Sequence, residues 1–333
     1  MSEPGTRRRE GEALDALLSV LGRGLRGCVL RHGMVARSPR MRQLFARLDA
    51  LGAGGAPVLL VGERGTGKEL AARALHAGSP RAGGPFVVVH CDALPETLVD
   101  SELFGHASGA FPGAARDRAG RLAAAAGGTL FLDAVDGLPP PVQGRLAGAL
   151  ESGVYRRLGD SRRRPCDVRL VAGCSPGGAL RDRLDPAFDR QLATAAVCRL
   201  PPLRERLEDL EPLVAYFLAR AAARDGIPWE LSPESLGLLL RHRWPGNVRE
   251  LEKVLEHACA VATPPTLHPE QLPADLLYDV TELDLDGAEA GEAAAELRRA
   301  LLAHGRRRRE TADALGVERV ELWRRLREAG LVR

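Results

Sequence analysis

Five short hydrophobic runs recur between residues 57 and 200, and each is apolar at consecutive rather than alternate positions. Continuous apolar runs of this length are typical of strands in a parallel sheet that is covered on both faces. Stretches with helical periodicity separate the runs, so the pattern predicts an α/β fold with a doubly wound parallel sheet. The predicted strands are Pro57–Val61, Phe86–His90, Thr129–Asp133, Asp167–Ala172 and Ala196–Leu200.

After Pro201 and Pro202 the pattern becomes purely helical. Helices predicted over Glu205–Ala223, Pro233–Arg241 and Asn247–Ala262 indicate a small helical lid. Residues 266–292 are rich in proline, alanine and acidic residues, which is typical of a linker. We expect a leader at 1–30 with a helix near Glu12–Leu25, an α/β domain at 31–203, the lid at 204–265, the linker at 266–292 and an all-α domain at 293–333.

The composition excludes several classes of protein. Apolar stretches such as Val58–Val61 are far shorter than the roughly 18 residues that a membrane span needs, and no apolar region of a signal peptide follows the N-terminus. The six cysteines form no C-x-x-C pair, which argues against a zinc ribbon and against a disulfide framework. We therefore expect a cytoplasmic protein with reduced thiols and no membrane partner.

Charge is unevenly distributed along the C-terminal part of the chain. Residues 275–292 hold seven acidic residues and no basic one, whereas residues 293–333 hold eleven arginines against six acidic residues. A basic segment behind an acidic linker indicates a nucleic-acid contact at the C-terminus. Elsewhere, arginine replaces lysine almost completely, because the chain has only Lys68 and Lys253.

Lys68 lies in a glycine-rich loop between the first predicted strand of the sheet and a helix predicted over Leu70–Ala77. This context matches the phosphate loop G-x-x-x-x-G-K, whose backbone N–H groups surround the phosphates while the lysine reaches the terminal phosphates. The alternative is a glycine-rich turn with an accidental lysine. The residues expected to bind ATP here are Gly62, Glu63, Arg64, Gly65, Thr66, Gly67, Lys68 and Glu69.

The metal ligands follow from the same reasoning. Glu69 occupies the position where Ser or Thr usually binds Mg²⁺ in such loops. Asp133 ends a buried strand, where a carboxylate is well placed to hold the Mg²⁺ that accompanies the nucleotide. We therefore expect Mg²⁺ to depend on Asp133 and on water.

Five segments together resemble the sigma-54-dependent enhancer-binding activators, and the resemblance covers roughly residues 30–333. These segments are GERGTGKE, DSELFGHASGAFPGA, GGTLFLD, LPPLRERLEDL and WPGNVREL. The resemblance implies an AAA+ fold, assembly into a ring or at least a dimer, and ATP-driven remodelling of the sigma-54 RNA polymerase complex. It also implies that Arg249 contacts ATP as a sensor arginine. The loop that implies contact with sigma-54 is Gly109, Ala110, Phe111, Pro112, Gly113 and Ala114.

The departures from the family pattern cluster among the residues that the family uses for ATP hydrolysis. Ala134 replaces the family's water-polarising Glu, and His90 and Ser175 stand where the family has Asn. Asp189 and Ala195 stand where the family has trans-acting arginines, and Pro112 replaces the threonine of GAFTGA. A trans-acting arginine supplies about 10³–10⁵ in rate, and a positioned general base about 10²–10⁴.

We therefore expect a domain that binds ATP but hydrolyses it poorly or not at all. Asp136 and Arg190 are the candidate catalytic replacements, because both lie close in sequence to lost groups. Three alternatives remain open: a fully active sigma-54 activator, a repressor or modulator independent of sigma-54, and an AAA+ chaperone or helicase loader unrelated to sigma-54. For the Gly109–Ala114 loop alone, the alternative is a relic loop with no partner.

The C-terminal segment resembles the Fis-type helix-turn-helix, with helices over Glu310–Leu315 and Glu318–Arg327 around a turn at Gly316. The resemblance implies a dimer on double-stranded DNA, with the second helix in the major groove. Trp323 is interpreted as a packing residue, and the alternative for the whole segment is a solvated pair of basic helices. The arginines expected to contact DNA are Arg306, Arg307, Arg308, Arg309, Arg319, Arg324 and Arg325.

Overall fold

The computed structural model describes residues 27–31, 33–177, 184–263, 265–280, 292–305 and 307–332. The chain forms two compact units, Cys28–Arg206 and the part from Leu207 onward, and each is described by itself. The helix expected near Glu12–Leu25 lies outside the described residues.

The first unit is built on a five-stranded parallel sheet in the order β11-β3-β10-β7-β4. All five predicted strands are confirmed, with ends that move by no more than two residues. Because every strand runs in the same direction, their carboxyl ends share one edge of the sheet. The strands are β3 (Val58–Val61), β4 (Phe86–His90), β7 (Thr129–Asp133), β10 (Arg169–Cys174) and β11 (Ala196–Arg199).

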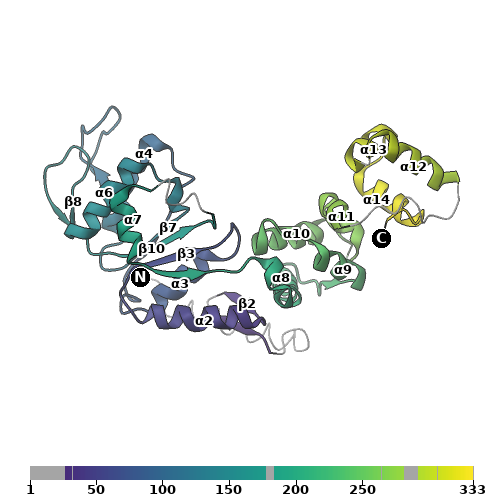
Figure 1. Cartoon of the computed structure of the whole chain (residues 1–333), viewed down its shortest axis with the longest axis horizontal. Coiled ribbons are helices and arrows are strands. Elements are labelled where there is room, and N and C mark those ends of the chain that lie inside the picture. The colour runs from purple at the N-terminus through teal and green to yellow at the C-terminus, as the bar shows by residue number, and fades with distance from the viewer. Residues whose placement is uncertain are drawn as a thin grey trace. The chain divides into compact units, whose positions relative to one another are not determined.

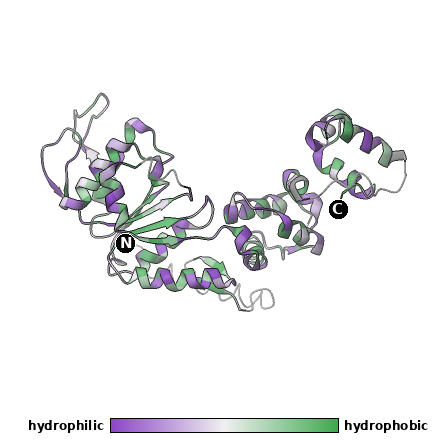
Figure 2. Cartoon of the chain, in the orientation of Figure 1, coloured by the Kyte–Doolittle hydropathy of each residue, from purple (hydrophilic) through white to green (hydrophobic). Residues whose placement is uncertain are grey.

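Helices cover both faces of this sheet (Figure 1). Within β3, Val58 and Leu60 pack with α2 and α3 on one face, while Leu59 packs with α4, α6 and α7 on the other. The strands are mainly hydrophobic, and the helices carry hydrophobic and polar residues in alternation (Figure 2), which is the pattern that predicted a doubly wound sheet. The helices are α2 (Pro39–Gly52), α3 (Lys68–Ala77), α4 (Glu96–Phe104), α5 (Arg121–Ala124), α6 (Pro140–Ser152) and α7 (Pro186–Ala193).

Short hairpins and 3₁₀ helices complete the first unit, and the hydrophobic pattern predicts none of them. Each strand has only two or three residues, too few to show a period. They are the pairs β1 (Val29–Arg31) with β2 (Met34–Ala36), β5 (Gly105–His106) with β6 (Arg118–Ala119), and β8 (Val154–Tyr155) with β9 (Arg164–Pro165), and the 3₁₀ helices η1 (Val135–Gly137) and η3 (Leu203–Glu205).

Arg169 is a charged residue buried inside this unit, with a relative exposure of 3%. Its guanidinium donates to the carbonyl oxygens of Leu51 (2.7 Å) and Gly52 (3.2 Å) at the end of α2, of Leu75 (3.2 Å) near the end of α3, and of Ala56 (3.2 Å) before β3. Burial lowers the pKa of Arg169. A cation at two helix C-termini satisfies carbonyl groups that have no partner within their own helix.

The second unit begins with the lid helices. The helix predicted over Glu205–Ala223 begins later, as α8 at Leu210: Arg206 has a non-helical backbone (φ −141°, ψ 45°), and the 3₁₀ helices η3 and η4 precede α8. The helices predicted at Pro233–Arg241 and Asn247–Ala262 are confirmed. The lid elements are η4 (Leu207–Asp209), α8 (Leu210–Asp225), β12 (Glu230–Leu231), α9 (Pro233–Arg241) and α10 (Asn247–Val261).

The first part of the expected linker is folded, which corrects the boundary drawn at residue 266. β13 (Thr266–Leu267) pairs in parallel with β12, and the 3₁₀ helix η5 (Pro269–Gln271) and α11 (Ala274–Val280) follow. Leu267, Leu272 and Leu277 are buried, so apolar burial orders a segment whose acidic composition suggested a linker. Three further helices end the chain: α12 (Glu292–Ala303), α13 (Arg308–Leu315) and α14 (Arg319–Glu328).

We predict that Arg169→Met destabilises the first unit by about 3–5 kcal/mol, because removal of the guanidinium leaves buried carbonyl groups without donors. The matched control is Arg81→Met, which removes an ion pair to the exposed carboxylate of Asp167 (2.5 Å); such pairs contribute about 0–1 kcal/mol. The measurement is the urea midpoint of each variant by circular dichroism. Equal midpoints for the two variants would contradict a structural role for Arg169.

Candidate nucleotide site and DNA-binding helices

The predicted phosphate loop connects β3, which ends at Val61, to α3, which begins at Lys68. Gly65 (φ 78°) and Gly67 (φ 103°) have left-handed backbone conformations that disfavour other residues. The Gly62 amide donates to the Cys174 carbonyl (3.0 Å), which fixes the start of the loop to β10. The loop therefore turns into the N-terminus of α3, where amide groups and the helix dipole favour an anion.

Lys68 is buried at the centre of this loop. Its Nζ donates to the carbonyl oxygens of Gly62 (2.9 Å) and Glu63 (3.2 Å). The Glu69 carboxylate forms an ion pair with Arg73, one turn further along α3 (2.7 Å). The ammonium is thus held inside the loop, at the place where phosphate oxygens bind in such loops.

Two arginines that the sequence analysis did not single out brace the loop from outside. Arg204 binds both carboxylate oxygens of Glu63, at 2.7 and 2.5 Å, and Arg206 donates to the carbonyl oxygen of Thr66 at 3.2 Å. Both arginines belong to the quoted segment LPPLRERLEDL. No local sequence signal links that segment to the loop, because 141 positions separate Arg204 from Glu63.

Asp133 ends β7 at the same edge of the sheet, opposite His90 of β4 in the strand register. Its Oδ1 accepts from the Ala134 amide (3.1 Å), and its Oδ2 lies 3.6 Å from Nδ1 of His90. Gly173 leaves room for this carboxylate, because a Cβ there would lie 3.1 Å from Asp133 Oδ1. A carboxylate oxygen beside a phosphate loop fits Mg²⁺ bound mainly through nucleotide phosphates.

Ala134 and Asp136 are the positions next to Asp133 that bear on ATP hydrolysis. Ala134 has a left-handed backbone (φ 53°) and no carboxylate. Asp136 lies on η1 and has one buried carboxylate oxygen without a partner among the described residues. Burial and the charge of Asp136 raise the pKa of the Cys174 thiol to about 11, while Lys68 lowers it. Asp136 and Lys68 therefore both act on this thiol at the carboxyl edge of the sheet.

Of the remaining candidates, His90 lies 3.6 Å from the Asp133 carboxylate, while Ser175, Arg190 and Arg249 are solvent-exposed. His90 and Ser175 are exposed at the ends of β4 and β10, and Arg190 is exposed on α7. Arg249 is exposed in the first turn of α10, in the second unit.

The Gly109–Ala114 loop lies between β5 and β6. The Ala114 amide donates to the Phe111 carbonyl (3.0 Å), and Gly113 has φ 98°. This matches a type II turn, in which proline suits the second position and glycine the third. The Phe111 ring packs edge-on against His106 (5.0 Å between centroids). Proline 112 therefore stabilises a tight turn at the loop tip rather than disrupting it.

The C-terminal helices form a helix-turn-helix with its own small core. Gly316 (φ 64°) ends α13, and the Val317 amide donates to the Ala312 carbonyl (3.1 Å). Trp323 is 2% exposed, so its interpretation as a packing residue is confirmed. The core residues include Leu297, Leu301, Ala312, Leu322, Leu326 and Leu331.

Most of the arginines expected to contact DNA are held by nearby carboxylates. Arg324 and Arg325 both bind Glu321 (2.9 Å each), Arg307 binds Glu310 (2.5 Å), and Arg319 binds Asp275 of α11. Arg308 and Arg309 belong to the first turn of α13, where Arg309 is exposed. Arg306 lies outside the described residues.

Among the described residues, no helix has the length and apolar character needed to cross a membrane.

The chain matches two family descriptions: the Sigma-54 interaction domain over residues 34–178 and the AAA+ ATPase lid domain over residues 204–286. It is similar to the transcriptional regulatory protein ZraR of Escherichia coli (strain K12), with 37% identity over 307 residues that cover 89% of this chain and 68% of that protein. It is also similar to ZraR of Klebsiella oxytoca, with 42% identity over 249 residues, or 73% of this chain and 56% of that protein.

Among solved structures, NtrX from Brucella abortus in complex with ATP is 28% identical, with a TM-score of 0.67 over 98% of this chain and 74% of that one. The chain spans about half the length of several relatives that it matches, such as 45% of the Nif-specific regulatory protein of Azotobacter vinelandii. These matches agree with the AAA+ sheet, the lid and the phosphate loop described above. The chain belongs to the sigma-54-dependent enhancer-binding transcriptional regulators.

Proposed function

We propose that this protein binds ATP with Mg²⁺ and double-stranded DNA as a transcriptional regulator, and that its ATP hydrolysis is impaired. The observation that carries the proposal is the pairing of an intact phosphate loop around Lys68 with Ala134 at the position where hydrolysis needs a carboxylate. The loop supplies binding groups, and the residue that follows β7, Ala134, has no carboxylate to activate water.

ATP would bind with its phosphates in the loop, from Gly62 to Glu69, above the N-terminus of α3. Lys68 would then exchange its contacts with the Gly62 and Glu63 carbonyls for phosphate oxygens. Asp133 would hold the Mg²⁺ that accompanies ATP. Arg249 of the second unit is the sensor arginine that the family resemblance implies. ATP bound to the related NtrX supports this assignment.

Hydrolysis requires a base or water-positioning group and a cation at the transferring phosphate. Asp136 is the one candidate for the first role with a buried, unpartnered oxygen among the described residues, and Arg190 on α7 is the candidate for the second. Loss of the family's carboxylate and arginine together removes contributions of about 10²–10⁴ and about 10³–10⁵. We therefore place turnover near background.

The same proposal assigns the C-terminal helices to DNA and the Gly109–Ala114 loop to sigma-54 RNA polymerase. The buried core beneath α14 leaves Arg324 and Arg325 exposed on its outer face, as a recognition helix requires. The turn at Pro112 and Gly113 keeps Phe111 on an ordered loop. The protein would act as an oligomer, either a dimer or an AAA+ ring. The alternative that the turn favours is an active sigma-54 activator, because the loop remains ordered despite Pro112.

For ATP, we predict that Lys68→Ala lowers the affinity for a fluorescent ATP analogue by about 100-fold or more, since a buried charge-assisted contact to phosphate is lost. The matched control is Lys253→Ala, which removes the only other lysine, an exposed residue of α10, and should leave the affinity unchanged.

Phosphate release by the unaltered protein, with and without DNA, should equal that of Lys68→Ala. Turnover of several per second that Lys68→Ala abolishes would refute impaired hydrolysis, and Asp136→Asn would then show whether Asp136 supplies the base. Absence of nucleotide binding by the unaltered protein would refute the whole assignment of the first unit.

For DNA, we predict that Arg324→Ala weakens binding to genomic fragments in gel shifts and reduces the slope of log affinity against log salt by about 1, as expected for one lost phosphate contact. Glu321→Gln should have the opposite effect, because it releases Arg324 and Arg325 from their shared carboxylate. Unchanged affinity in both variants would show that α14 does not contact DNA.

A further inference from the structure

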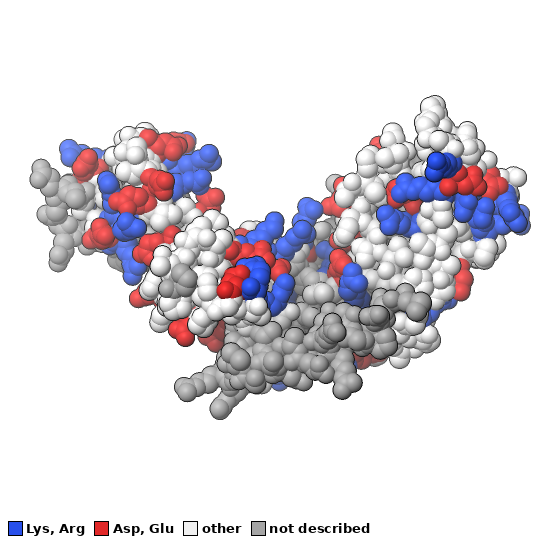
Figure 3. All heavy atoms as spheres, turned by 180° about the vertical axis from the view of Figure 1, so that it is seen from behind, with Lys and Arg blue, Asp and Glu red and all other residues white. Residues whose placement is uncertain are grey.

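A second concentration of arginines lies far from the helix-turn-helix in sequence, in the connection between β8 and β9. Residues 156–164 hold five arginines and a single acidic residue, Asp160. Basic side chains, with acidic ones among them, gather at the edge of the first unit that carries β8 (Figure 3). We call residues 156–164 the arginine loop.

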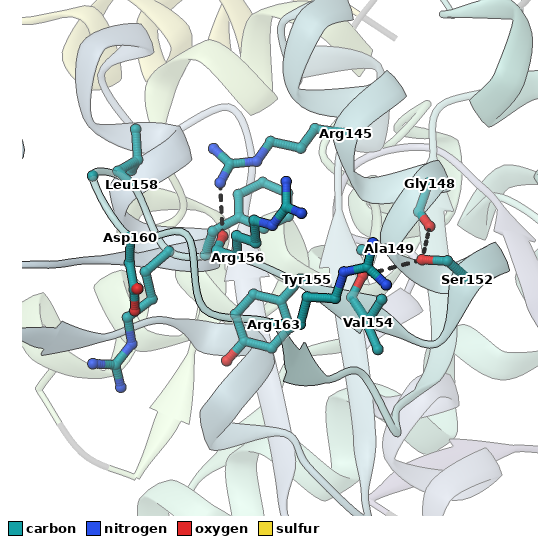
Figure 4. A pocket seen from close by; sticks show the side chains of 13 residues that line it. Arg145, Gly148, Ala149, Ser152, Val154, Tyr155, Arg156, Leu158, Asp160 and Arg163 are labelled. Atoms are coloured by element: carbon teal, nitrogen blue, oxygen red, sulfur yellow. Dashed lines mark hydrogen bonds between the residues drawn. The ribbon is translucent and has the colours of Figure 1, made fainter.

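The arginine loop borders an open groove of about 640 Å³. Arg145 of α6 and Arg156 and Arg163 of the loop bring their guanidinium groups to this groove (Figure 4). Arg145 lies over the Phe104 ring (4.1 Å) and donates to the Arg156 carbonyl (2.7 Å). The groove is thus lined by several cations on a fixed surface.

Three of these arginines have no counter-ion among the described residues. Arg145, Arg157 and Arg164 pair with Asp100 (3.1 Å), Asp117 (3.7 Å) and Asp160 (3.2 Å). No carboxylate within the described part of the chain lies at ion-pair distance from Arg156, Arg162 or Arg163, and all three are exposed. Exposed like charges this close in sequence repel one another, so the loop as it stands favours an anion.

The arginine loop is ordered by backbone contacts. Asp160 accepts from the Arg162 amide (2.9 Å) as well as from Arg164, and these hydrogen bonds lower the pKa of Asp160. The Leu158 amide donates to Gly105 (2.9 Å), and the Leu158 carbonyl accepts from Ala107 (2.9 Å). These bonds join the arginine loop to the base of the Gly109–Ala114 loop, so an anion bound on one lies beside the other.

The chemistry of the groove selects the kind of anion. Guanidinium groups match the paired oxygens of phosphate. Single-stranded nucleic acid is usually bound by exposed aromatic rings that stack on bases, but Phe104 and Tyr155 beneath this groove are 0% and 5% exposed. Exposed arginines without an aromatic platform suit the phosphate backbone of duplex DNA, which carries a regular row of charges.

We propose that the arginine loop is a second DNA-binding site, which takes the duplex backbone without regard to sequence, next to the loop assigned to sigma-54. The site would place promoter DNA beside the Gly109–Ala114 loop, whereas the helix-turn-helix would hold a separate, specific sequence. This inference extends the proposed function and does not depend on ATP hydrolysis.

The test uses the full chain carrying Arg324→Ala and Arg325→Ala, so that the contribution of α14 is already removed. Binding of a fluorescent duplex of random sequence is measured by anisotropy between about 50 and 200 mM salt. Adding Arg156→Ala, Arg162→Ala and Arg163→Ala should reduce affinity roughly tenfold or more and lower the salt slope by about 2–3. The same three positions changed to lysine should retain most of the affinity, which excludes misfolding as the cause.

The control removes the same charge from the same unit with Arg40→Ala, Arg47→Ala and Arg73→Ala, on α2 and α3, and should leave the slope nearly unchanged. Equal losses in both triple variants, or no loss at the arginine loop, would overturn the proposal. The proposal would also be overturned if the arginine-loop variant lost binding to a poly-glutamate probe and not to DNA. The surface would then bind an acidic protein segment. If Arg324→Ala weakens specific DNA binding but the arginine-loop substitutions have no effect, this inference is wrong and the proposed function still stands.

Discussion

The buried guanidinium of Arg169 is the interaction on which the arrangement of the first unit depends. It comes from the start of β10, at the centre of the sheet, and binds carbonyl groups from α2, from α3 and from the segment before β3. Burial of a cation is costly unless its donors are satisfied, and backbone carbonyls satisfy them here. The C-terminal part of α3 is therefore fixed to the sheet, while its N-terminus carries Lys68. Because both ends of α3 are held in place, the direction of the backbone amides in its first turn is fixed.

Binding groups and catalytic groups in the nucleotide site differ in how they are made. The phosphate loop depends on glycine conformations and backbone amides, which survive many changes of side chain. Hydrolysis depends on individual side chains, so a single replacement can remove such a group completely. A pocket can therefore lose catalysis and retain affinity. Pro112 belongs to a third kind of change, since it alters the stiffness of a loop whose backbone turn already suits proline.

The sequence predicts those features that are local. Continuous apolar runs predict all five strands of the sheet, and the phosphate loop is recognisable because its glycines, Lys68 and flanking elements are consecutive. The turn at Gly316 is predictable for the same reason. In each case the physical cause lies within about ten residues of the chain.

Features created by contacts between distant segments could not be predicted. Arg204 meets Glu63 across 141 positions, and Arg169 meets Leu51 across 118. Nothing in the local sequence or spacing distinguishes either arginine from the many exposed arginines. The fold of residues 266–280 was missed because an acidic surface concealed the buried leucines of α11, and the two-residue strands β5, β6, β8 and β9 are too short to carry a period. The unpartnered oxygen of Asp136 is likewise a property of its surroundings.

The brace around the phosphate loop has a mechanical consequence. Arg204 and Arg206 form hydrogen bonds with Glu63 and Thr66. Both arginines are among the last residues of the first unit, immediately before the chain continues into the second. A ligand that shifts the loop must either stretch these bonds or carry the crossing segment with it. A ligand that moves the loop therefore also acts on the last residues of the first unit, and it does so by binding alone.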